Sequence, residues 1–570
     1  MSNLKSLSQI FVLTFLVLFA CTSKDKKNTA PSEDILINQI GYISNASKYA
    51  LLRIDADDFQ LKTLDGKTVF AGETGDWKAW ELSDDSVRLA DFSGFTEPGE
   101  YVLSVNDTAQ SYPFAIANHL FGDLADAALK SYYYARCGVD IEPEYGGKWH
   151  WKGGHPDTTV MVHVSAVDGY RPKGTVISSP GGWYDAGDFG KYVVNSGITT
   201  YTLLLSNQLN RDYHQKQLLN IPESGNDLPD ILDETLVNLK WMLTMQDSND
   251  GGVYHKLTTK NFSGFVMPTE STAQRYVVQK STAAALDFVA TMAHATTELE
   301  RAGSAELAAK AKKSAVDAWG WALRNPDVTY KQPDDISTGA YGDNSLQDEW
   351  FWAAAEMYIL DNKRQYFDGI LNNYQKPVTP TWNTVQTLGV ISILTSDKRA
   401  EFPEMESDFI EHVDHLLRKE HTAPYVVSID KFAWGSNSDV ANDGMLKLIA
   451  YKLTGDDKYV NSARNDLDYI LGRNTTAFCF VTGFGKKSPM HPHNRISASD
   501  GVDEPVPGYL AGGPNISVMT DCDPNEVKRS PFPAASYVDE ECSYSTNETA
   551  INWNAPLVFL VSGLDDFDTK

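Results

Sequence analysis

The sequence has few basic residues for its number of acidic ones, and it has no internal repeat. Lysine and arginine number 49 against 76 aspartates and glutamates, which gives a net charge of −27. Such a charge repels nucleic acid and anionic lipid and leaves neutral or cationic ligands as partners, although the solubility of an exported protein explains it equally well. The lack of a recurring sequence period disfavours a fold of stacked repeats.

The N-terminal apolar run, IFVLTFLVLFA at residues 10–20, is too short to span a membrane. Lys5 precedes the run and Cys21 follows it at once, which is typical of an export signal. The residues LFAC, ending at Cys21, resemble a bacterial lipobox, in which the cysteine carries a lipid. We therefore expect a lipoprotein signal peptide over residues 1–21 and a polar tether over residues 22–32. The protein would be exported and held at the bacterial outer membrane by this lipid alone. The sequence does not indicate whether it faces the periplasm or the cell exterior.

At 570 residues the chain is too long for one ordinary domain, and its composition of 42% hydrophobic residues supplies a sizeable core. Seven short runs with alternating apolar residues occupy residues 33–117, separated by Asp-Gly, Pro-Gly and Asn-Asp turn signals. This spacing predicts a β-sandwich. Its aromatic residues are few and scattered, which favours docking against the rest of the protein over carbohydrate binding.

Beyond residue 118 the apolar residues recur at helical spacing in about a dozen segments, among them VVNSGITTYTLLLSNQL at residues 193–209. Long loops rich in glycine and proline join these segments. Because no strands are predicted between the helices, a parallel α/β fold is disfavoured. We expect a closed double ring of helices, since stacked repeats would show a sequence period.

The candidate site is GGWYDAGDFGKY, residues 181–192, in which Asp185 and Asp188 lie three residues apart among glycines and aromatics. The glycines predict a loop, so both carboxylates can point to one place, with Trp183 and Tyr184 as its walls. Two acids beside aromatic rings suit sugar chemistry, because one acid can activate a water that the other orients. Taken alone, the spacing leaves a calcium loop or a cluster of Asx turns equally open.

Two further segments favour the first of these interpretations. The segments YVDEECSYSTNETAINWNAP, residues 537–556, and GFGKKSPMHPHNR, residues 483–495, join residues 181–192 in a pattern that resembles the active-site motifs of glycoside hydrolase family 9. Asn494 and Cys479 depart from the residues usual in the family, but neither departure touches an acid that the chemistry needs.

The resemblance implies a fold and an activity. The opening NQIGY of the first module resembles the immunoglobulin-like domain of one branch of the family. The implied fold is multidomain, with an N-terminal immunoglobulin-like β-sandwich (33–117) followed by an all-α (α/α)6 toroid, the catalytic domain (118–570), whose loops form an open cleft. The implied reaction is hydrolysis of β-1,4-glucosidic bonds with inversion of the anomeric configuration. The implied substrates are β-glucans such as cellulose-like chains, xyloglucan or mixed-linkage glucan, which the enzyme would cleave by endo attack. The protein is expected to be a monomer. An exo-acting enzyme stays open as an alternative. A non-catalytic surface glycan-binding lipoprotein also stays open, but the presence of all three acids of the family's site, Asp185, Asp188 and Glu548, disfavours it.

The resemblance also implies roles for single residues. Glu548 lies among apolar neighbours that raise a carboxyl pKa and is expected to be the general acid, with Asp188 as the base and Asp185 sharing its water. His493 and Arg495 are expected to donate hydrogen bonds to sugar hydroxyls. The other residues expected to bind substrate are Asp539, Tyr544, Trp553, Trp183 and Tyr184.

No cofactor is expected to be required. Relatives with the immunoglobulin-like domain often hold a structural zinc, but at the matching positions Cys137, Gly154, His155 and Tyr184 two of the four ligands are missing, so we predict no zinc. Calcium is common in the family and is kept as a candidate structural ion without assigned ligands. The acidic stretch 247–257 lacks the terminal glutamate of an EF-hand, and a solvated turn explains it equally well.

Four cysteines remain besides Cys21. Cys522 and Cys542 flank an acidic segment near the expected site and can pair, but with Cys137 and Cys479 three pairings are possible and free buried thiols stay open.

Overall fold

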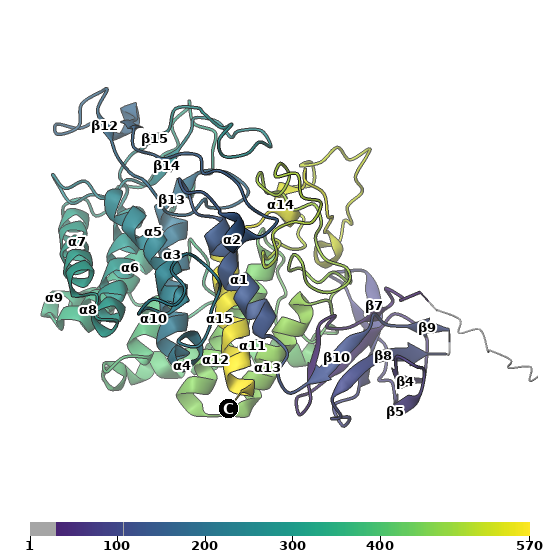
Figure 1. The fold of residues 1–570 in the computed structure, drawn as a ribbon. Helices are drawn as coiled ribbons and strands as arrows, with labels where there is room; N and C mark the ends of the chain where they lie inside the picture. Colours follow the sequence, from purple (N-terminus) through teal and green to yellow (C-terminus); the bar gives the residue numbers. More distant parts are fainter. Residues whose placement is uncertain (1–29, 107, 570) are drawn as a thin grey trace, which may run out of the picture.

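The computed structural model describes residues 30–106 and 108–569. A β-sandwich lies beside a larger helical domain that begins with α1 (Gly122–Tyr134), as Figure 1 shows. The predicted fold, an immunoglobulin-like sandwich followed by an all-α toroid, is therefore confirmed. The predicted signal segment, with Cys21, and most of the tether lie outside the described residues. Within the described ranges, no helix is both long and apolar enough to cross a membrane.

Two sheets form the sandwich. One has the strand order β1-β3-β7-β6, with bounds Ile35–Leu36, Tyr49–Leu52, Asp85–Asp91 and Lys78–Trp80. The other has the order β2-β10-β8-β4-β5, with bounds Gly41–Ile43, Phe114–Ala117, Gly99–Val105, Asp58–Thr63 and Thr68–Glu73, and β9 (Ala109–Gln110) pairs with β8. Alternate apolar residues such as Phe59, Leu61 and Leu103 point between the sheets and are fully buried.

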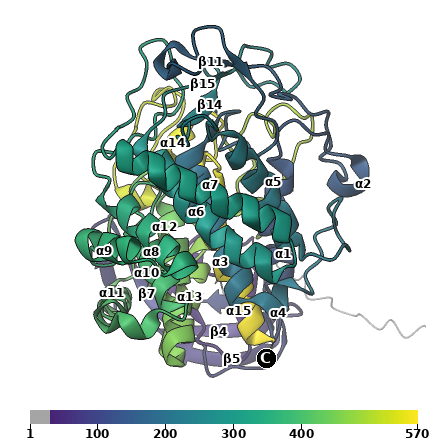
Figure 2. The same ribbon diagram turned by 90° about the vertical axis from the view of Figure 1, so that its left-hand side faces the viewer.

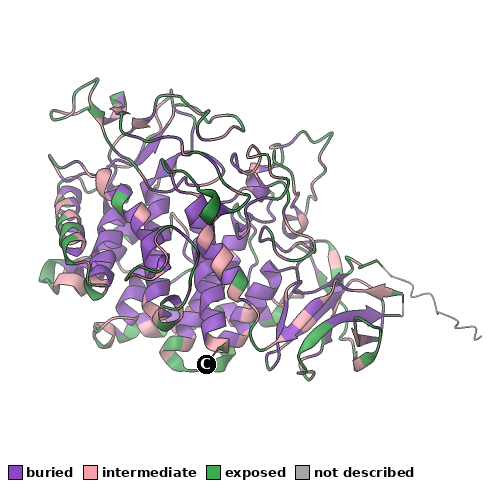
Figure 3. Ribbon diagram, viewed as in Figure 1, coloured by how far each residue is buried: buried purple, intermediate pink, exposed green. Residues whose placement is uncertain are grey.

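The long helices, which Figures 1 and 2 show from the side, pack as an inner and an outer ring in which each outer helix packs on an inner one. The inner helices are α3 (Val193–Leu209), α6 (Thr282–Arg301), α8 (Gln347–Asp361), α10 (Gln386–Leu394), α12 (Ser436–Thr454) and α15 (Ile551–Asp568). The outer ones are α1, α5 (Asp230–Thr244), α7 (Ala305–Arg324), α9 (Arg364–Asn373), α11 (Pro403–Thr422) and α13 (Asp457–Ile470). Helix α3 is buried along nearly its whole length, whereas α7 buries only an alanine stripe with two tryptophans and exposes Lys310 and Lys313. Figure 3 shows this difference between the two helices.

A small sheet interrupts the helices at the end of the rings where the inner helices begin. Its order is β12-β11-β15-β14-β13, with bounds Val176–Ile177, Val160–Val162, Tyr276–Val277, Lys256–Thr258 and Lys191–Tyr192. The prediction that no strands lie between the helices is wrong, because strands of two or three residues are too short to show a periodic pattern. Since β13 runs directly into α3, residues 181–192 are placed at this end of the rings.

The sandwich is docked onto the helical domain by polar and apolar contacts. Asn38 donates a hydrogen bond of 2.8 Å to Asp468 of α13, and Gln39 donates one of 2.8 Å to the carbonyl of Ala477. The Trp80 ring lies 4.6 Å from the ring of Tyr425 and 5.8 Å from that of Phe432. These apolar contacts make Trp80 part of the core of the helical domain, which supports a docking role for the sandwich.

Trp80→Ala tests this docking. Removing a buried indole from the interface should lower the free energy of unfolding by about 3–5 kcal/mol, which differential scanning calorimetry would detect as a lower melting temperature. Trp77→Ala is the matched control, because this tryptophan of the same domain is 44% exposed and its loss should change stability by less than about 0.5 kcal/mol. Equal melting temperatures for the two variants would contradict the docking role of Trp80.

Candidate active site

The loop 181–192 holds its two aspartates with different partners. Asp185 accepts hydrogen bonds from Asn195 Nδ2 at 3.0 and 3.1 Å and from the Tyr341 hydroxyl at 2.9 Å. Asp188 accepts from the backbone N–H of Gly190 at 2.9 Å and from the Tyr192 hydroxyl at 3.1 Å. Asp185 is 1% exposed and Asp188 is 7% exposed, so Asp188 is the more accessible of the two.

Burial and the neighbouring Asp188 carboxylate raise the pKa of Asp185 to about 8, although the hydrogen bonds from Asn195 and Tyr341 act in the opposite direction. The two carboxyls therefore form a pair in which Asp185 resists ionisation near neutral pH.

Glu548 joins this pair from the other end of the chain. It directly precedes Thr549, Ala550 and the first turn of α15, and it forms a parallel β-bridge with His493. Burial raises the pKa of Glu548 well above its usual value, and Asp188 and Asp185 raise it further, while Arg495 and a hydrogen bond with the Gly187 backbone oppose the rise. This shift favours the protonated form of Glu548, which is the form that a general acid needs.

The close approach of two loops makes this assembly possible. A Cβ atom at Gly187 would come within 2.1 Å of the backbone oxygen of His493, so only glycine fits there. Arg495 donates to the Gly187 carbonyl from its backbone N–H at 3.1 Å and from Nη1 at 2.6 Å. The segment 483–495 is thereby fixed against the aspartate loop.

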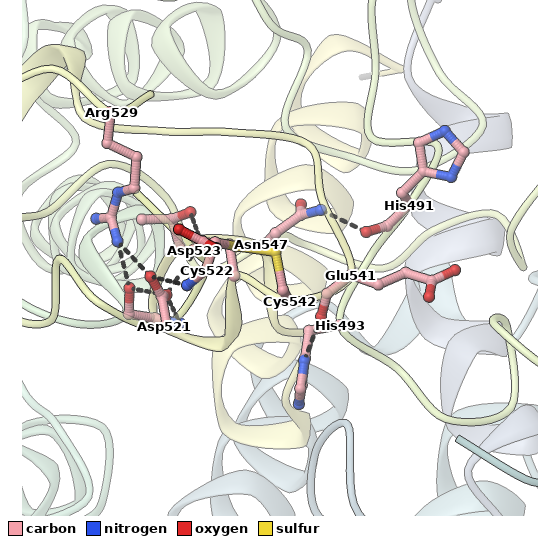
Figure 4. Close-up of a disulfide and its surroundings, with 12 residues drawn as sticks. His491, His493, Asp521, Cys522, Asp523, Arg529, Glu541, Cys542 and Asn547 are labelled. Carbon is pink, nitrogen blue, oxygen red and sulfur yellow. Dashed lines mark hydrogen bonds and ion pairs between the residues drawn. A yellow bond between two sulfur atoms is a disulfide. The ribbon is translucent and has the colours of Figure 1, made fainter. Parts of the chain in front are cut away.

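A disulfide and a buried aspartate support the segment ahead of Glu548 (Figure 4). Cys522 is bonded to Cys542, whereas Cys137 and Cys479 are free and buried. The Asp521 carboxylate accepts from the backbone N–H of Ser545 at 3.1 Å and pairs with Arg529 at 3.0 Å. These contacts fix the short helix α14 (Tyr544–Asn547), which ends immediately before Glu548.

His493 and Arg495 lie beside the acids, as predicted, but much of their hydrogen bonding is internal. His493 Nδ1 donates to the carbonyl of Glu541 at 2.5 Å, and burial lowers the pKa of His493, so the neutral ring keeps Nε2 as an acceptor. Arg495 Nε donates to the carbonyl of Ser263 at 3.0 Å. Arg495 therefore positions two loops as well as placing positive charge near Glu548.

Trp183 and Tyr184, which were expected to bind substrate, both have buried side chains. Trp183 is fully buried and donates to Glu234 at 2.8 Å, and Tyr184 is 4% exposed with its hydroxyl bonded to the Gly154 carbonyl at 3.2 Å. The prediction that Trp183 forms a wall for a ligand is wrong, because its ring is fully buried, whereas Tyr184 lines a cavity together with Asp185 and Asp188.

Trp553 and Asp539 make contacts within the protein, and their contact with substrate stays a prediction. The indole of Trp553 packs against Gly435, where a Cβ atom would lie 2.7 Å from its Nε1. Asp539 accepts from the backbone N–H groups of Met490 at 2.7 Å and His491 at 2.9 Å, which uses its carboxylate to shape the histidine segment.

Tyr544 alone of these five residues presents its ring beside His493, at 5.9 Å between ring centroids, and it also lies 5.5 Å from the ring of the exposed Trp434. The sequence interpretation missed Trp434, Tyr341 and Tyr192. Tyr341 had no local signal, because it reaches Asp185 from 156 residues away in the chain.

The residues at the expected zinc position do not fit a zinc ion. The Cys137 thiol donates to the carbonyl of His155 at 3.3 Å, and His155 Nδ1 is hydrogen-bonded to the Tyr184 hydroxyl at 2.8 Å. Two protein donors cannot complete a tetrahedral site, and across residues 30–106 and 108–569 no three His, Cys, Asp or Glu side chains are grouped to hold a metal.

The acidic turn at 247–257 is also a poor calcium loop. Asp247 and Asp250 both accept from Lys280 Nζ, at 2.8 and 2.9 Å, so their charge is already compensated by an ammonium group. A structural calcium elsewhere stays a prediction, and no chemical step below depends on a metal.

Comparisons with known proteins agree with this geometry. Residues 121–561 match the model of glycosyl hydrolase family 9, and residues 30–110 match that of the cellulase N-terminal ig-like domain. The chain is 42% identical to a xyloglucan-specific endo-β-1,4-glucanase of Bacteroides ovatus over 96% of both chains, and 32% identical to endoglucanase D of Acetivibrio thermocellus over 99% of this chain and 88% of the relative. A solved Bacteroides ovatus GH9 structure matches with a TM-score of 0.88 and 41% identity, covering 95% of this chain and 100% of the other. With both of its domains and its three clustered acids accounted for, the chain belongs to glycosyl hydrolase family 9.

Proposed function

We propose that the protein is an endo-acting β-1,4-glucanase that hydrolyses its substrate with inversion, and that xyloglucan is the first substrate to test. The observation that carries the proposal is the convergence of the Asp185–Asp188 pair with Glu548 from a distant segment, where burial and both aspartates raise the pKa of Glu548. The two relatives named above, an endo-β-1,4-glucanase and an endoglucanase, support the bond type and the mode of attack, and the Bacteroides relative supports xyloglucan.

The three acids divide the chemistry between them. Inverting hydrolysis needs a protonated carboxyl at the leaving oxygen and a carboxylate behind a water on the opposite face of the sugar. The raised pKa of Glu548 supports its role as the acid. The greater exposure of Asp188 supports its role as the base, while the buried Asp185 shares and orients the water. His493 offers Nε2 to a sugar hydroxyl.

Tyr341 is a positioning residue for this pair. Its backbone has a φ of 48°, in the left-handed region that side chains other than glycine seldom adopt. Two neighbours hold that conformation: His255 Nε2 donates to the Ala340 carbonyl at 2.9 Å, and Lys256 Nζ donates to the Gly339 carbonyl at 2.6 Å. The Tyr341 hydroxyl is thereby aimed at Asp185.

Tyr341→Phe should move the pH dependence of the reaction. Removing the hydroxyl removes a donor that favours the ionised Asp185, so its pKa rises, and the acidic limb of kcat/KM should move to higher pH by about one pH unit. The control is Tyr358→Phe, which makes the same chemical change at a hydroxyl bonded to Glu401 at 2.7 Å on another part of the protein. Two identical pH profiles would contradict the positioning role.

The proposed function is tested on soluble xyloglucan, mixed-linkage glucan and carboxymethyl cellulose. Endo attack lowers viscosity well before reducing ends accumulate, whereas release of only glucose or cellobiose at the earliest times would favour an exo enzyme. Proton NMR of a fresh digest should show the α-anomer first from the β-linked chain. Initial appearance of the β-anomer would contradict inversion.

Glu548→Gln and Asp188→Asn separate the two roles. Glu548→Gln should lower kcat on polysaccharides by about 10²–10⁴ but spare aryl glycosides with very good leaving groups, which need little protonation. Asp188→Asn should be severe on both kinds of substrate, because no other group activates the water. Equal losses for Glu548→Gln on both kinds of substrate would argue against its role as the acid.

We also propose that the protein is an exported monomer, anchored to the outer membrane through a lipid on Cys21, on the basis of its N-terminal sequence. Cys21→Ser should release the mature protein from the membrane fraction, because the thioether to the lipid cannot form. The measurement is membrane fractionation combined with mass spectrometry of the mature N-terminus. A wild-type protein that is soluble and carries no lipid would contradict the proposal.

A further inference from the structure

The connection between β14 and β15, residues 259–275, is much longer than an ordinary hairpin loop of about two to five residues. It belongs to the small sheet that also carries β13, the strand that follows the aspartate loop. Ordered loops of this length within compact domains are usually functional.

This loop carries two exposed phenylalanines. In the described part of the chain, aromatic side chains that are at least 40% exposed are rare. They are Trp77 (44%), Tyr170 (64%), Phe262 (46%), Phe265 (41%) and Trp434 (43%). Three of these five rings lie next to residues of the active site, which distinguishes them from scattered apolar residues on the rest of the surface.

Arg495 fixes the two phenylalanines relative to the catalytic loop. Its guanidinium carbon lies 5.4 Å from the ring centroid of Phe262 and 5.7 Å from that of Phe265, and its Nε binds the carbonyl of Ser263 between them. The same guanidinium binds the carbonyl of Gly187, between the two catalytic aspartates. The rings are therefore held at a defined place and do not need to be ordered by a ligand.

The two rings continue a row of rings across the acids. Phe265 lies 5.2 Å from His493, His493 lies 5.9 Å from Tyr544, and Tyr544 lies 5.5 Å from Trp434. His493 is paired with Glu548 at the middle of this row. Phe265 and Tyr544 are thus both neighbours of His493, and Trp434 extends the row from Tyr544.

We propose that Phe262 and Phe265 form an outer sugar subsite, which takes the apolar face of a neutral pyranose beyond the sugars bound at Asp188 and Glu548. The inference rests on the proposed function. Flat apolar rings stack on the apolar faces of pyranose units, and the Nε and Nη1 groups of Arg495 behind these rings already donate to backbone carbonyls, so the rings provide the contact surface for a neutral sugar. The sugar is either a main-chain glucose or a xylose branch.

The test compares the wild type with the double variant Phe262→Ala/Phe265→Ala on cellohexaose, on a xyloglucan oligosaccharide of equal main-chain length, and on an aryl β-cellobioside too short to reach the subsite. The double variant should raise KM on the long substrates by about three- to tenfold, with little change on the aryl cellobioside. A rise on both long substrates assigns the subsite to the main chain, and a rise on the xyloglucan oligosaccharide alone assigns it to a branch.

Isothermal titration calorimetry of the long substrates in a Glu548→Gln background should show the same loss of affinity without turnover. Phe262→Tyr/Phe265→Tyr should retain binding, because it keeps both rings. Trp77→Ala is the matched control, since this exposed ring also lies over an arginine, 5.8 Å from Arg88, but belongs to the sandwich. It should leave every value unchanged.

Two results would overturn the subsite: unchanged affinity of the double variant for both long substrates, or an equal loss on the aryl cellobioside, which would indicate general damage to the site. Failure of the proposed function can be distinguished from failure of the subsite, because the wild type would then be inactive on every β-glucan. That result would overturn the subsite as well.

Discussion

The contact between the aspartate loop and the histidine segment is the constraint on which the site depends. Gly187 lies so close to the backbone of His493 that no side chain fits between them, and Arg495 binds the Gly187 carbonyl twice. Because His493 is paired with Glu548, this single contact joins the acid to the pair that activates water. The inner helices supply a rigid base, since α3 begins directly after one loop and α15 soon after Glu548.

Three carboxyls held together can persist only if they do not all ionise. Burial and the neighbouring Asp188 raise the pKa of Asp185 to about 8, and burial together with both aspartates raises the pKa of Glu548 well above its usual value. Arg495 opposes this rise at Glu548, so its positive charge limits how far the pKa of the acid is raised. The roles proposed for Asp185 and Asp188 thus agree with the depth at which each is buried and with its hydrogen-bond partners.

The sequence predicted the elements whose signals are local. The apolar pattern at 193–209 predicted helix α3 at its observed bounds, and the acids at 185, 188 and 548 lie together in the structure. It could not predict which way a side chain points in a loop, or which residues far apart in the chain meet at the site. Trp183 and Tyr184 follow glycines in a loop, and no period there tells which side chains face inward. Tyr341 and the phenylalanines at 262 and 265 reach the site from loops without a motif, and the small sheet consists of strands too short for a pattern.

The site can be divided into a chemical part and a binding part with separate supports. The acids are fixed by the two apposed loops and by α3 and α15, whereas Trp434 follows a segment whose Tyr425 and Phe432 pack on Trp80 of the sandwich. A change in the docking of the sandwich therefore acts first on the row of rings at Trp434 and only indirectly on Asp188. Because the opposite end of the row is fixed by Arg495, which also binds the aspartate loop, the two ends of the row should differ in how strongly they are coupled to catalysis. Arg495 contacts both the ring of Phe265 and the loop that carries Asp188, so sugar stacking at Phe265 and catalysis at Asp188 depend on the same side chain. Stacking at Trp434 does not depend on Arg495 in this way.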